Sequence, residues 1–264
     1  GRGMLRRVQG VAGNEEHMRK LRLAALRKVM REHTYGHRLA YMASRLSLPM
    51  AAAALPKIAV LARAENKAQL DLLVGHAMRQ TYARMTLHVV LAPGWESNAV
   101  AAQSGVRLIS HAHAVGNTIG EAVGQSDMVA GMVSEDYYGP NYLLDLALAT
   151  RYSDAAAIGK GAHFAVTDAA LEIQDRQAAY RPTGSLHARC AAIRFGLVAG
   201  RNAAEWVAAL PTLRLETEHG LAIDEFNYCR GGADSVHGAL VQEAVDDLQD
   251  LNAGVALGEL LARA

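Results

Sequence analysis

Short apolar runs alternate with helical segments along the part of this chain that follows residue 56. The apolar run at 57–62 precedes a helical pattern at 66–80, in which Leu70, Leu73 and Ala77 recur on one side. Alternation of this kind indicates a mostly parallel sheet with helices on its faces and right-handed crossovers. We expect strands at 57–62, 87–91, 106–109 and 128–133, and a short helix at 118–123.

In a sheet of this type, ligands bind beyond the carboxyl ends of the strands. Function is therefore expected just after Ala62, Leu91 and Val133. None of these strands is followed by the glycine-rich loop of a dinucleotide-binding protein or of a P-loop NTPase, which argues against both classes. The glycine spacing ahead of the 159–161 segment, Gly-Lys-Gly, is also wrong for a phosphate loop.

Composition narrows the class of protein further. The 264 residues are 51 % hydrophobic and 20 % charged, which is typical of a folded domain. A net charge of +1 argues against nucleic acid as a partner. Cys190 and Cys229 make neither a disulfide framework nor a zinc motif. Because no apolar run reaches about 18–20 residues and the chain begins without a signal peptide's apolar core, we expect a cytoplasmic protein.

The first 54 residues differ in character from the rest and are predicted to form a helical extension ahead of a domain at 55–264. Asn14 suits a helix N-cap, with Glu15 and Glu16 in the first turn, and the segment 33–37 should divide the helical stretch in two. Basic residues are abundant up to Arg45. Such a basic amphipathic helix either packs on its own protein or rests on an anionic membrane, here the inner face.

Two segments of the domain resemble family 2 glycosyltransferases. Residues 57–93 are similar to the opening unit of that family, with Gln80-Thr81-Tyr82 at the helix end. Residues 134–145, Ser-Glu-Asp-Tyr-Tyr-Gly-Pro-Asn-Tyr-Leu-Leu-Asp, resemble the acidic segment of a bacterial polysaccharide-biosynthesis subgroup, and the elements at 151–155 and 159–163 follow in register. The resemblance covers residues 57–247 and implies a GT-A fold.

A second, shorter resemblance lies in the extension. Residues 31–38, Arg-Glu-His-Thr-Tyr-Gly-His-Arg, look like the tail of a GT-B glycosyltransferase of the spore-maturation class. This similarity implies that the chain is the carboxyl part of a longer two-enzyme protein.

The family resemblance implies a divalent-metal site for Mg²⁺ or Mn²⁺ at the end of the fourth strand. Its ligands would be Glu135, Asp136 and the late His237, which follows a strand-like segment at 222–229. The family's first two acidic positions are Val133 and Ser134 here, so one ligand is weakened or lost. Without the flanking match, the same carboxylates would suit a solvated turn or a helix cap.

The resemblance also implies residues for the donor, the acceptor and the base. Glu205, at the start of a short helix, would be the base, with Trp206 as a stacking face for a sugar; the alternative is a surface glutamate beside a core tryptophan. Gly184 and Ser185 take the place of an acceptor-side turn. The nucleotide sugar would contact Asp136 together with Arg63, Glu65, Gly120, Glu121, Lys160 and His163. Each of these could equally serve packing, a turn or a helix cap.

The function implied is inverting transfer of a sugar from a nucleotide sugar, with a UDP-linked donor favoured, to a glycan or other hydroxyl acceptor in surface-polysaccharide synthesis. The alternative is a non-catalytic GT-A-like module that binds glycan or organises a partner transferase, because several site features are eroded. The basic helices would then dock to a partner transferase domain, a second copy of the chain or a membrane.

Overall fold

The structure is a computed structural model that describes residues 14–95, 105–167, 170–233, 238–246 and 248. His237, one of the three predicted metal ligands, lies outside these residues. The chain divides into two compact units, one formed by Leu55–Asp246 and the other by Gly1–Ala54 with Asp247–Ala264.

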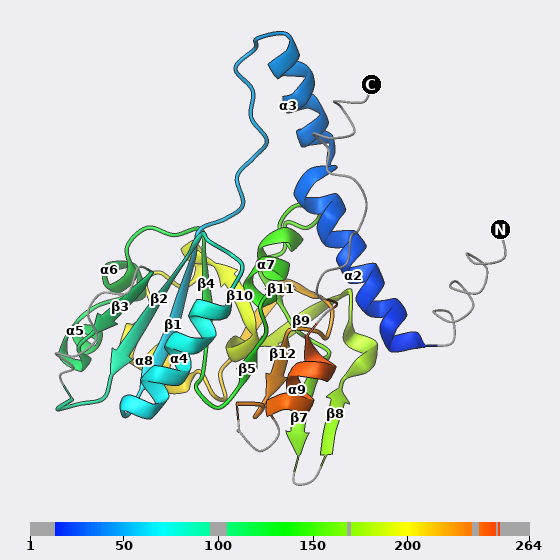
Figure 1. The fold of residues 1–264 in the computed structure, drawn as a ribbon. Helices are drawn as coiled ribbons and strands as arrows, with labels where there is room; N and C mark the ends of the chain where they lie inside the picture. The colour runs from blue at the N-terminus through cyan, green and yellow to red at the C-terminus, as the bar shows by residue number, and fades with distance from the viewer. Residues whose placement is uncertain (1–13, 96–104, 168–169, 234–237, 247, 249–264) are drawn as a thin grey trace. The chain divides into compact units, whose positions relative to one another are not determined.

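The larger unit is built on an eight-stranded sheet with the order β3-β2-β1-β4-β10-β6-β11-β9 (Figure 1). Neighbours from β3 to β4 are parallel; β10 is antiparallel to both β4 and β6, β11 is parallel to β6, and β9 closes the edge in the antiparallel sense. The strands are β1 (Ile58–Ala64), β2 (Met85–Leu91), β3 (Val106–Ile109), β4 (Met128–Gly131), β6 (Ala157–Gly159), β9 (Arg181–His187), β10 (Ala191–Arg194) and β11 (Arg214–Ala222). The predicted fold class, α/β with a mostly parallel sheet flanked by helices and with N-terminal helices, is confirmed.

The helices that join the strands cover both faces of this sheet. α4 (Lys67–Arg79) joins β1 to β2, and its N-cap Asn66 accepts a hydrogen bond from the Gln69 backbone. The return crossover from β3 to β4 runs in the opposite direction along the sheet, so right-handed connections place its helices on the other face. These helices are α5 (His111–Gly116) and α6 (Ile119–Val123), joined there by α8 (Ala203–Ala209).

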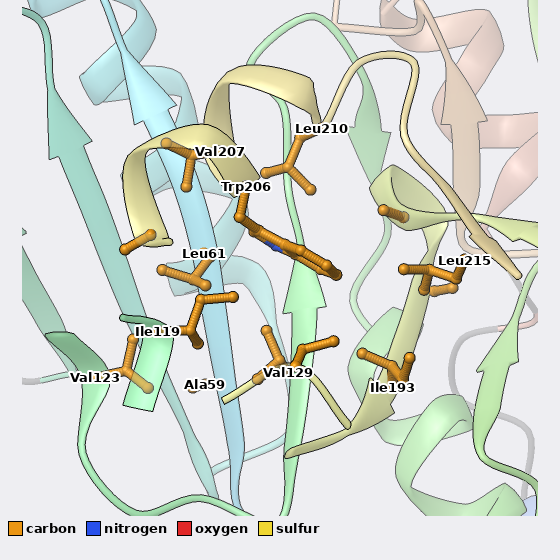
Figure 2. Close-up of a cluster of buried hydrophobic side chains, with 14 of the residues drawn as sticks. Ala59, Leu61, Ile119, Val123, Val129, Ile193, Trp206, Val207, Leu210 and Leu215 are labelled. Carbon is orange, nitrogen blue, oxygen red and sulfur yellow. The ribbon is translucent and has the colours of Figure 1, made fainter. Parts of the chain in front are cut away.

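The core on the α5, α6 and α8 face explains why these segments fold together. Ala59 and Leu61 alternate along β1 and point to the same side, as successive strand residues must. Trp206 of α8 fills the space between them and β4, with 4 % of its surface exposed (Figure 2). An aromatic side chain of this size dominates the energy of a core when it is buried among aliphatic neighbours such as Leu210 and Ile193.

A second sheet of four short strands has the order β5-β12-β7-β8. Three of its strands follow strands of the large sheet along the chain: β5 comes after β4, β7 after β6 and β12 after β11. Since β4, β6 and β11 run in the same direction, the small sheet gathers the segments that leave their carboxyl ends. The strands are β5 (Tyr137–Tyr138), β7 (His163–Thr167), β8 (Ala170–Gln174) and β12 (Tyr228–Arg230).

The prediction of a continuous strand-like segment at 222–229 was wrong. β11 ends at Ala222, and the chain passes through Asn227, whose φ of 62° is in the left-handed region, before β12 begins in the other sheet. A polar segment rich in carboxylates therefore leaves the edge of the large sheet instead of extending it.

Two further α-helices and three 3₁₀ turns complete the described part of the larger unit. α7 (Tyr142–Ala149) is buried along its whole length, and α9 (Gly238–Val245) contacts β12. The 3₁₀ turns lie at Arg176–Ala178, Ala188–Cys190 and Phe195–Leu197. The turn at Ala188–Cys190 immediately precedes β10, which places it beside the carboxyl end of the antiparallel β4.

The described part of the smaller unit consists of α2 (Glu15–Glu32) and α3 (Tyr35–Arg45). Asn14 caps α2 by accepting a hydrogen bond from the His17 backbone, as predicted, and the break between the helices falls within the expected segment. None of the described helices is both long enough and apolar enough to span a membrane.

Candidate functional site

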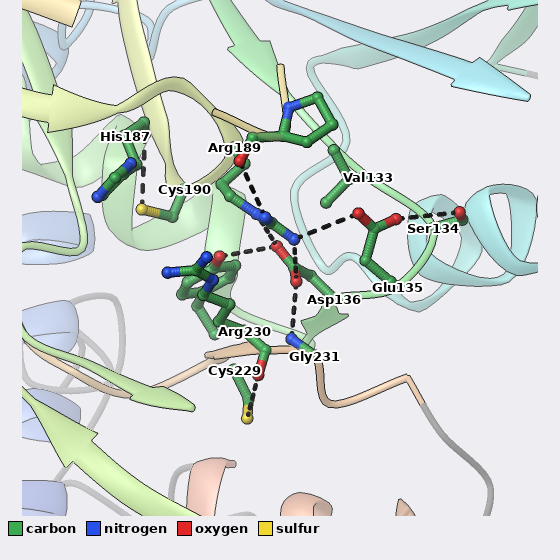
Figure 3. A network of polar contacts seen from close by, with 12 residues as sticks. Val133, Ser134, Glu135, Asp136, His187, Arg189, Cys190, Cys229, Arg230 and Gly231 are labelled. Atoms are coloured by element: carbon green, nitrogen blue, oxygen red, sulfur yellow. Dashed lines mark hydrogen bonds and ion pairs between the residues drawn. The ribbon is translucent and has the colours of Figure 1, made fainter. Parts of the chain in front are cut away.

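Asp136, which follows the carboxyl end of β4, is the centre of a buried polar cluster (Figure 3). Arg189 donates two hydrogen bonds to the Asp136 carboxylate, from Nε at 2.6 Å and from Nη2 at 2.5 Å. The Tyr228 hydroxyl donates to Oδ2 at 2.7 Å, and the Gly231 backbone N–H donates to Oδ1 at 2.8 Å. Four donors from two distant parts of the chain thus converge on one carboxylate that has no exposed surface.

The neighbouring Tyr138 holds Arg189 in place. Its hydroxyl accepts a hydrogen bond from the Val133 N–H at 3.0 Å and donates one to the Arg189 carbonyl at 2.8 Å. The guanidinium is also anchored at its far end, where Nη1 donates to the Pro211 carbonyl at 3.0 Å. The end of β4 and the turn before β10 are therefore tied together on both sides of the ion pair.

Burial and pairing act in opposite directions on these two charges. Burial raises the pKa of the Asp136 carboxyl, while the hydrogen bonds from Arg189, Gly231 and Tyr228 oppose that rise. Burial also works against the charge of Arg189, but the contact with Asp136 outweighs it and raises the pKa of the guanidinium. Arg189 therefore stays charged and supplies the counter-charge that a buried carboxylate requires.

A pocket of about 490 Å³ opens beside this cluster. Glu135 lies at its wall with 53 % of its side chain exposed, and its Oε1 is 3.5 Å from Nη2 of Arg189. The side chain of Arg230 is exposed and forms no hydrogen bond or ion pair with the residues that the structure describes. The charged and titratable residues that line the pocket are Glu135, His163, Asp175, His187, Arg189 and Arg230.

The two histidines of this pocket, His163 and His187, both have lowered pKa values. Burial lowers the pKa of His187, and the nearby Arg214 and Arg230 lower it further. Burial likewise lowers the pKa of His163, while the Gly161 carbonyl and Asp175 oppose this shift and Arg230 adds to it. The pocket therefore combines the cations Arg189 and Arg230 with the carboxylates Glu135 and Asp175, and burial is the main cause of both histidine shifts.

A second pocket, of about 450 Å³, shares Asp175 and His187 with the first. It adds the cations Arg176 and Arg214, and also Ser185, which was predicted to face the acceptor. The two pockets are adjacent, and their arginines are Arg176 of η1 (Arg176–Ala178), Arg189 of the 188–190 turn, Arg214 of β11 and Arg230 of β12.

The described residues do not fit a divalent metal ion. The carboxylate of Asp136 is fully occupied by protein donors, and Glu135 approaches a guanidinium rather than a second carboxylate. No group of three or more His, Cys, Asp or Glu side chains within the described ranges could hold a metal ion. The guanidinium of Arg189 takes the place where a metal bound to Asp136 would be expected.

Lys160, one of the predicted donor-binding residues, forms internal ion pairs although it also borders the second pocket. Its ammonium is buried, 2.7 Å from Asp224 Oδ1 and 3.3 Å from Asp145 Oδ2. Both carboxylates are almost fully buried as well. The lysine therefore neutralises two internal charges, and its Nζ is not presented to a phosphate.

Gly120 and Glu121 also have structural roles. Gly120 lies against the carbonyl of Ala199, where an added Cβ would be only 3.2 Å from that oxygen. Glu121 forms a capping box with Thr118, whose backbone N–H and hydroxyl both donate to its carboxylate and lower its pKa. Because Ala199 follows β10, which ends beside the start of β4, this region lies at the amino end of β4, away from Asp136.

The predicted base Glu205 and its predicted stacking partner Trp206 line the same pocket but differ in exposure. Glu205 is exposed at the start of α8 and lines a separate pocket of about 370 Å³ that shares no residue with the pocket beside Arg189. Trp206 is packed into the core, with Arg201 5.8 Å from the centre of its ring. Its indole packs mainly among aliphatic side chains, yet Trp206 also lines the pocket of Glu205, so its role as a stacking face stays a prediction.

The remaining predicted residues keep accessible positions. Arg63 and Glu65, at the carboxyl end of β1, form an ion pair of 2.7 Å that is partly exposed. Ser185 accepts a hydrogen bond from Arg214 and donates one to Glu216 across the β9–β11 pair, beside the open Gly184.

The residues that carried the family resemblance prove to bind one another. The Thr81 N–H donates to the Pro140 carbonyl at 2.8 Å, and the Gln80 amide donates to the Gly139 carbonyl at 2.9 Å. Gly139 has no room for a side chain, since a Cβ would lie 2.5 Å from Asp246 Oδ1. Much of the Tyr-Tyr-Gly-Pro-Asn motif thus forms the support for Asp136.

Sequence reasoning missed Arg189, Arg230 and Tyr228. Each is separated from Asp136 by more than fifty residues and belongs to no recognisable motif. Only an excess of cations in the 176–230 region, at Arg176, Arg189, Arg214 and Arg230, could have pointed to an anion site.

No protein-family model matches the chain, and the comparison with curated proteins found no relative. Among solved structures, residues 1–349 of S. aureus TarS match 75 % of this chain and 68 % of their own, at 12 % identity and a TM-score of 0.45. The same protein in complex with UDP-GlcNAc matches 66 % and 58 %, at 10 % identity and a TM-score of 0.43. The mannosyltransferase PcManGT from Pyrobaculum calidifontis, in complex with GDP-Man and Mn²⁺, matches 85 % and 71 %, at 11 % identity and a TM-score of 0.43. These are distant similarities.

Proposed function

We propose that this chain binds a nucleotide sugar, with a UDP-linked donor favoured, and acts as a glycosyltransferase of the GT-A type. The observation that carries the proposal is the pocket that Arg189 and Arg230 line beside Asp136, at the carboxyl edge where parallel sheets bind ligands. The diphosphate would meet Arg230 and the pocket histidines, and the sugar would extend into the neighbouring hollow near Ser185. Membership of family 2 and a surface-polysaccharide product are part of this proposal.

The proposed reaction is an inverting single displacement, in which a carboxylate deprotonates the acceptor hydroxyl and the hydroxyl displaces the nucleotide diphosphate. Two carboxylates are candidates for the base. Glu205 is the one that the resemblance predicts, and Glu135 is the one that lines the same pocket as Arg230. Separate Glu205→Gln and Glu135→Gln variants distinguish them, since only loss of the base removes turnover while donor binding persists.

The first experiment is a calorimetric titration of the chain with UDP, GDP and CDP. One nucleotide is expected to bind, and Arg230→Ala should weaken its binding at least about tenfold, because a hydrogen bond to a charged group contributes about 1.5–3 kcal/mol. Arg107→Ala is the matched control: this arginine is also exposed but lies on β3, at the far edge of the large sheet. Equal losses in the two variants, or no binding of any nucleotide, would contradict the proposed site.

A second candidate function is a binding module without turnover. It is favoured by the full occupation of the Asp136 carboxylate and by the separation of Glu205 from the pocket. Nucleotide binding without transfer or donor hydrolysis, over a range of nucleotide sugars, would support this candidate over the enzyme.

We also propose that α3 makes a peripheral contact with an anionic membrane. Its apolar residues Tyr35, Leu39 and Met42, followed by Leu46, are at least half exposed and recur at helical spacing. α3 contains Arg38 and Arg45 but no acidic residue, which suits anionic lipid.

This contact can be measured by sedimentation with lipid vesicles. The unchanged chain should bind phosphatidylglycerol vesicles and leave phosphatidylcholine vesicles largely unbound, and the double variant Leu39→Glu/Met42→Glu should bind at least about tenfold less, since each buried apolar side chain contributes about 1.5–3 kcal/mol. Leu72→Glu is the control, because Leu72 is an exposed apolar residue of α4 in the other unit. Undiminished binding by the α3 variant would refute the contact.

A further inference from the structure

We infer that the pocket beside Asp136 recognises a diphosphate without a divalent metal ion, using arginine side chains as its cations. The inference rests on the proposed function and adds to it the source of the positive charge. It is carried by the saturation of Asp136, by the position of the Arg189 guanidinium and by the side chain of Arg230, which has no partner among the described residues.

The carboxylate of Asp136 has no acceptor site left for a metal. Two carboxylate oxygens offer about four lone-pair positions. Arg189 takes two of them through Nε and Nη2, the Tyr228 hydroxyl takes a third, and the Gly231 N–H takes the fourth. A metal ion could bind there only by displacing a bidentate guanidinium from a fully buried position, which would leave Arg189 without its partner.

The other carboxylates at the pocket do not replace Asp136 as metal ligands. Glu135 is 3.5 Å from Nη2 of Arg189, so its charge is already directed at that guanidinium. Asp175 lines both pockets, and the second of them is also lined by Arg176 and Arg214. Hard divalent cations require several oxygen ligands at once, and within the described ranges no such set is assembled.

Arg230 is placed to supply, in place of a metal ion, the positive charge that binds a diphosphate. It follows Cys229 of β12, directly before Gly231, whose N–H binds Asp136. The Asp136 cluster therefore fixes the backbone beside Arg230 while its guanidinium remains exposed at the pocket (Figure 3). A planar guanidinium donates two parallel hydrogen bonds to phosphate oxygens, a geometry that a lysine does not reproduce.

The test compares nucleotide binding with and without metal, using the full chain. Calorimetric titrations with UDP, GDP and CDP are run in EDTA and again in MnCl₂, and Mn²⁺ alone is titrated separately. We expect the dissociation constant of the bound nucleotide to change by less than about twofold between the two conditions, with no heat of binding for Mn²⁺ alone at the site. Arg230→Ala should lose at least about tenfold in affinity in EDTA, and Arg230→Lys should recover only part of that loss.

Three results would overturn the inference, and they separate it from the proposed function. Nucleotide binding that appears only with Mn²⁺ refutes the arginine site and leaves the proposed function standing. Metal-independent binding that Arg230→Ala does not weaken, in a variant with an unchanged melting temperature, places the diphosphate elsewhere. Failure of every nucleotide to bind under both conditions refutes the proposed function, and this inference with it.

Discussion

The Arg189→Ala variant is expected to lose about 3–5 kcal/mol of its free energy of unfolding, the cost typical of breaking a buried ion pair. Asp136 has no exposed surface, and its two hydrogen bonds to Arg189 are 2.5 and 2.6 Å long. Removal of the guanidinium leaves a carboxylate that burial already disfavours in its charged form. Urea unfolding followed by circular dichroism at pH 7.5 measures the loss.

The free energy of unfolding of Arg189→Ala should change with pH in a definite direction. Without Arg189, burial holds the pKa of Asp136 above its ordinary value of 3.8, so the folded state binds the proton more tightly than the unfolded state. Stability should therefore rise as the pH falls from neutral toward that ordinary pKa, and the deficit should shrink.

The paired variant Asp136→Asn/Arg189→Met is the control for the Arg189 prediction. It removes both charges together and should be clearly more stable than Arg189→Ala, because replacing both partners avoids an uncompensated charge. A loss below about 1 kcal/mol in Arg189→Ala, the range of exposed pairs, would mean that the buried contact is not formed.

The second large effect is expected at Lys160. Lys160→Met should lower the free energy of unfolding by about 3–5 kcal/mol, because Asp145 and Asp224 would both lose their buried ammonium partner. The three side chains are almost fully buried, and the ammonium lies between the carboxylates at 2.7 and 3.3 Å. The measurement is again urea unfolding at neutral pH.

A surface lysine supplies the matched control for Lys160. Lys67 forms a 2.5 Å ion pair with Asp71, but both side chains are more than half exposed. Lys67→Met should therefore change the free energy of unfolding by about 0–1 kcal/mol. If Lys160→Met instead preserved stability and weakened nucleotide binding, the original prediction of Lys160 as a phosphate ligand would be restored.

The strands and crossovers of the first half were predictable because they depend on local pattern. β1 and β2 are apolar runs, and Asn66 caps α4 with the residue type that helix starts prefer. The pattern also placed Asp136 just beyond β4, at the edge where function was expected. Each of these features rests on residues within a few positions of one another.

The motif at 134–145 illustrates what pattern could not resolve. Its tyrosines, glycine and asparagine were matched as markers of a sugar-nucleotide site, yet Tyr138 binds the Arg189 backbone and Gly139 makes room for Asp246. A motif that resembles a family's can therefore mark the frame of a site as well as its chemistry. The same holds for Lys160, whose partners Asp145 and Asp224 lie 15 and 64 positions away.

The sequence by itself determined the α/β class, the order of the first strands and helices, and the position of the acidic segment at a strand end, since all of these follow from periodicity and capping along the chain. Only the tertiary structure decided which neighbours surround each of the candidate functional side chains. Whether Asp136 meets a metal or an arginine, whether Trp206 faces a sugar or the core, and whether Lys160 is available to a ligand depend on which distant residues arrive beside them. The energy of a buried charge is set by those neighbours and by its distance from water, and the local sequence pattern predicts neither of them.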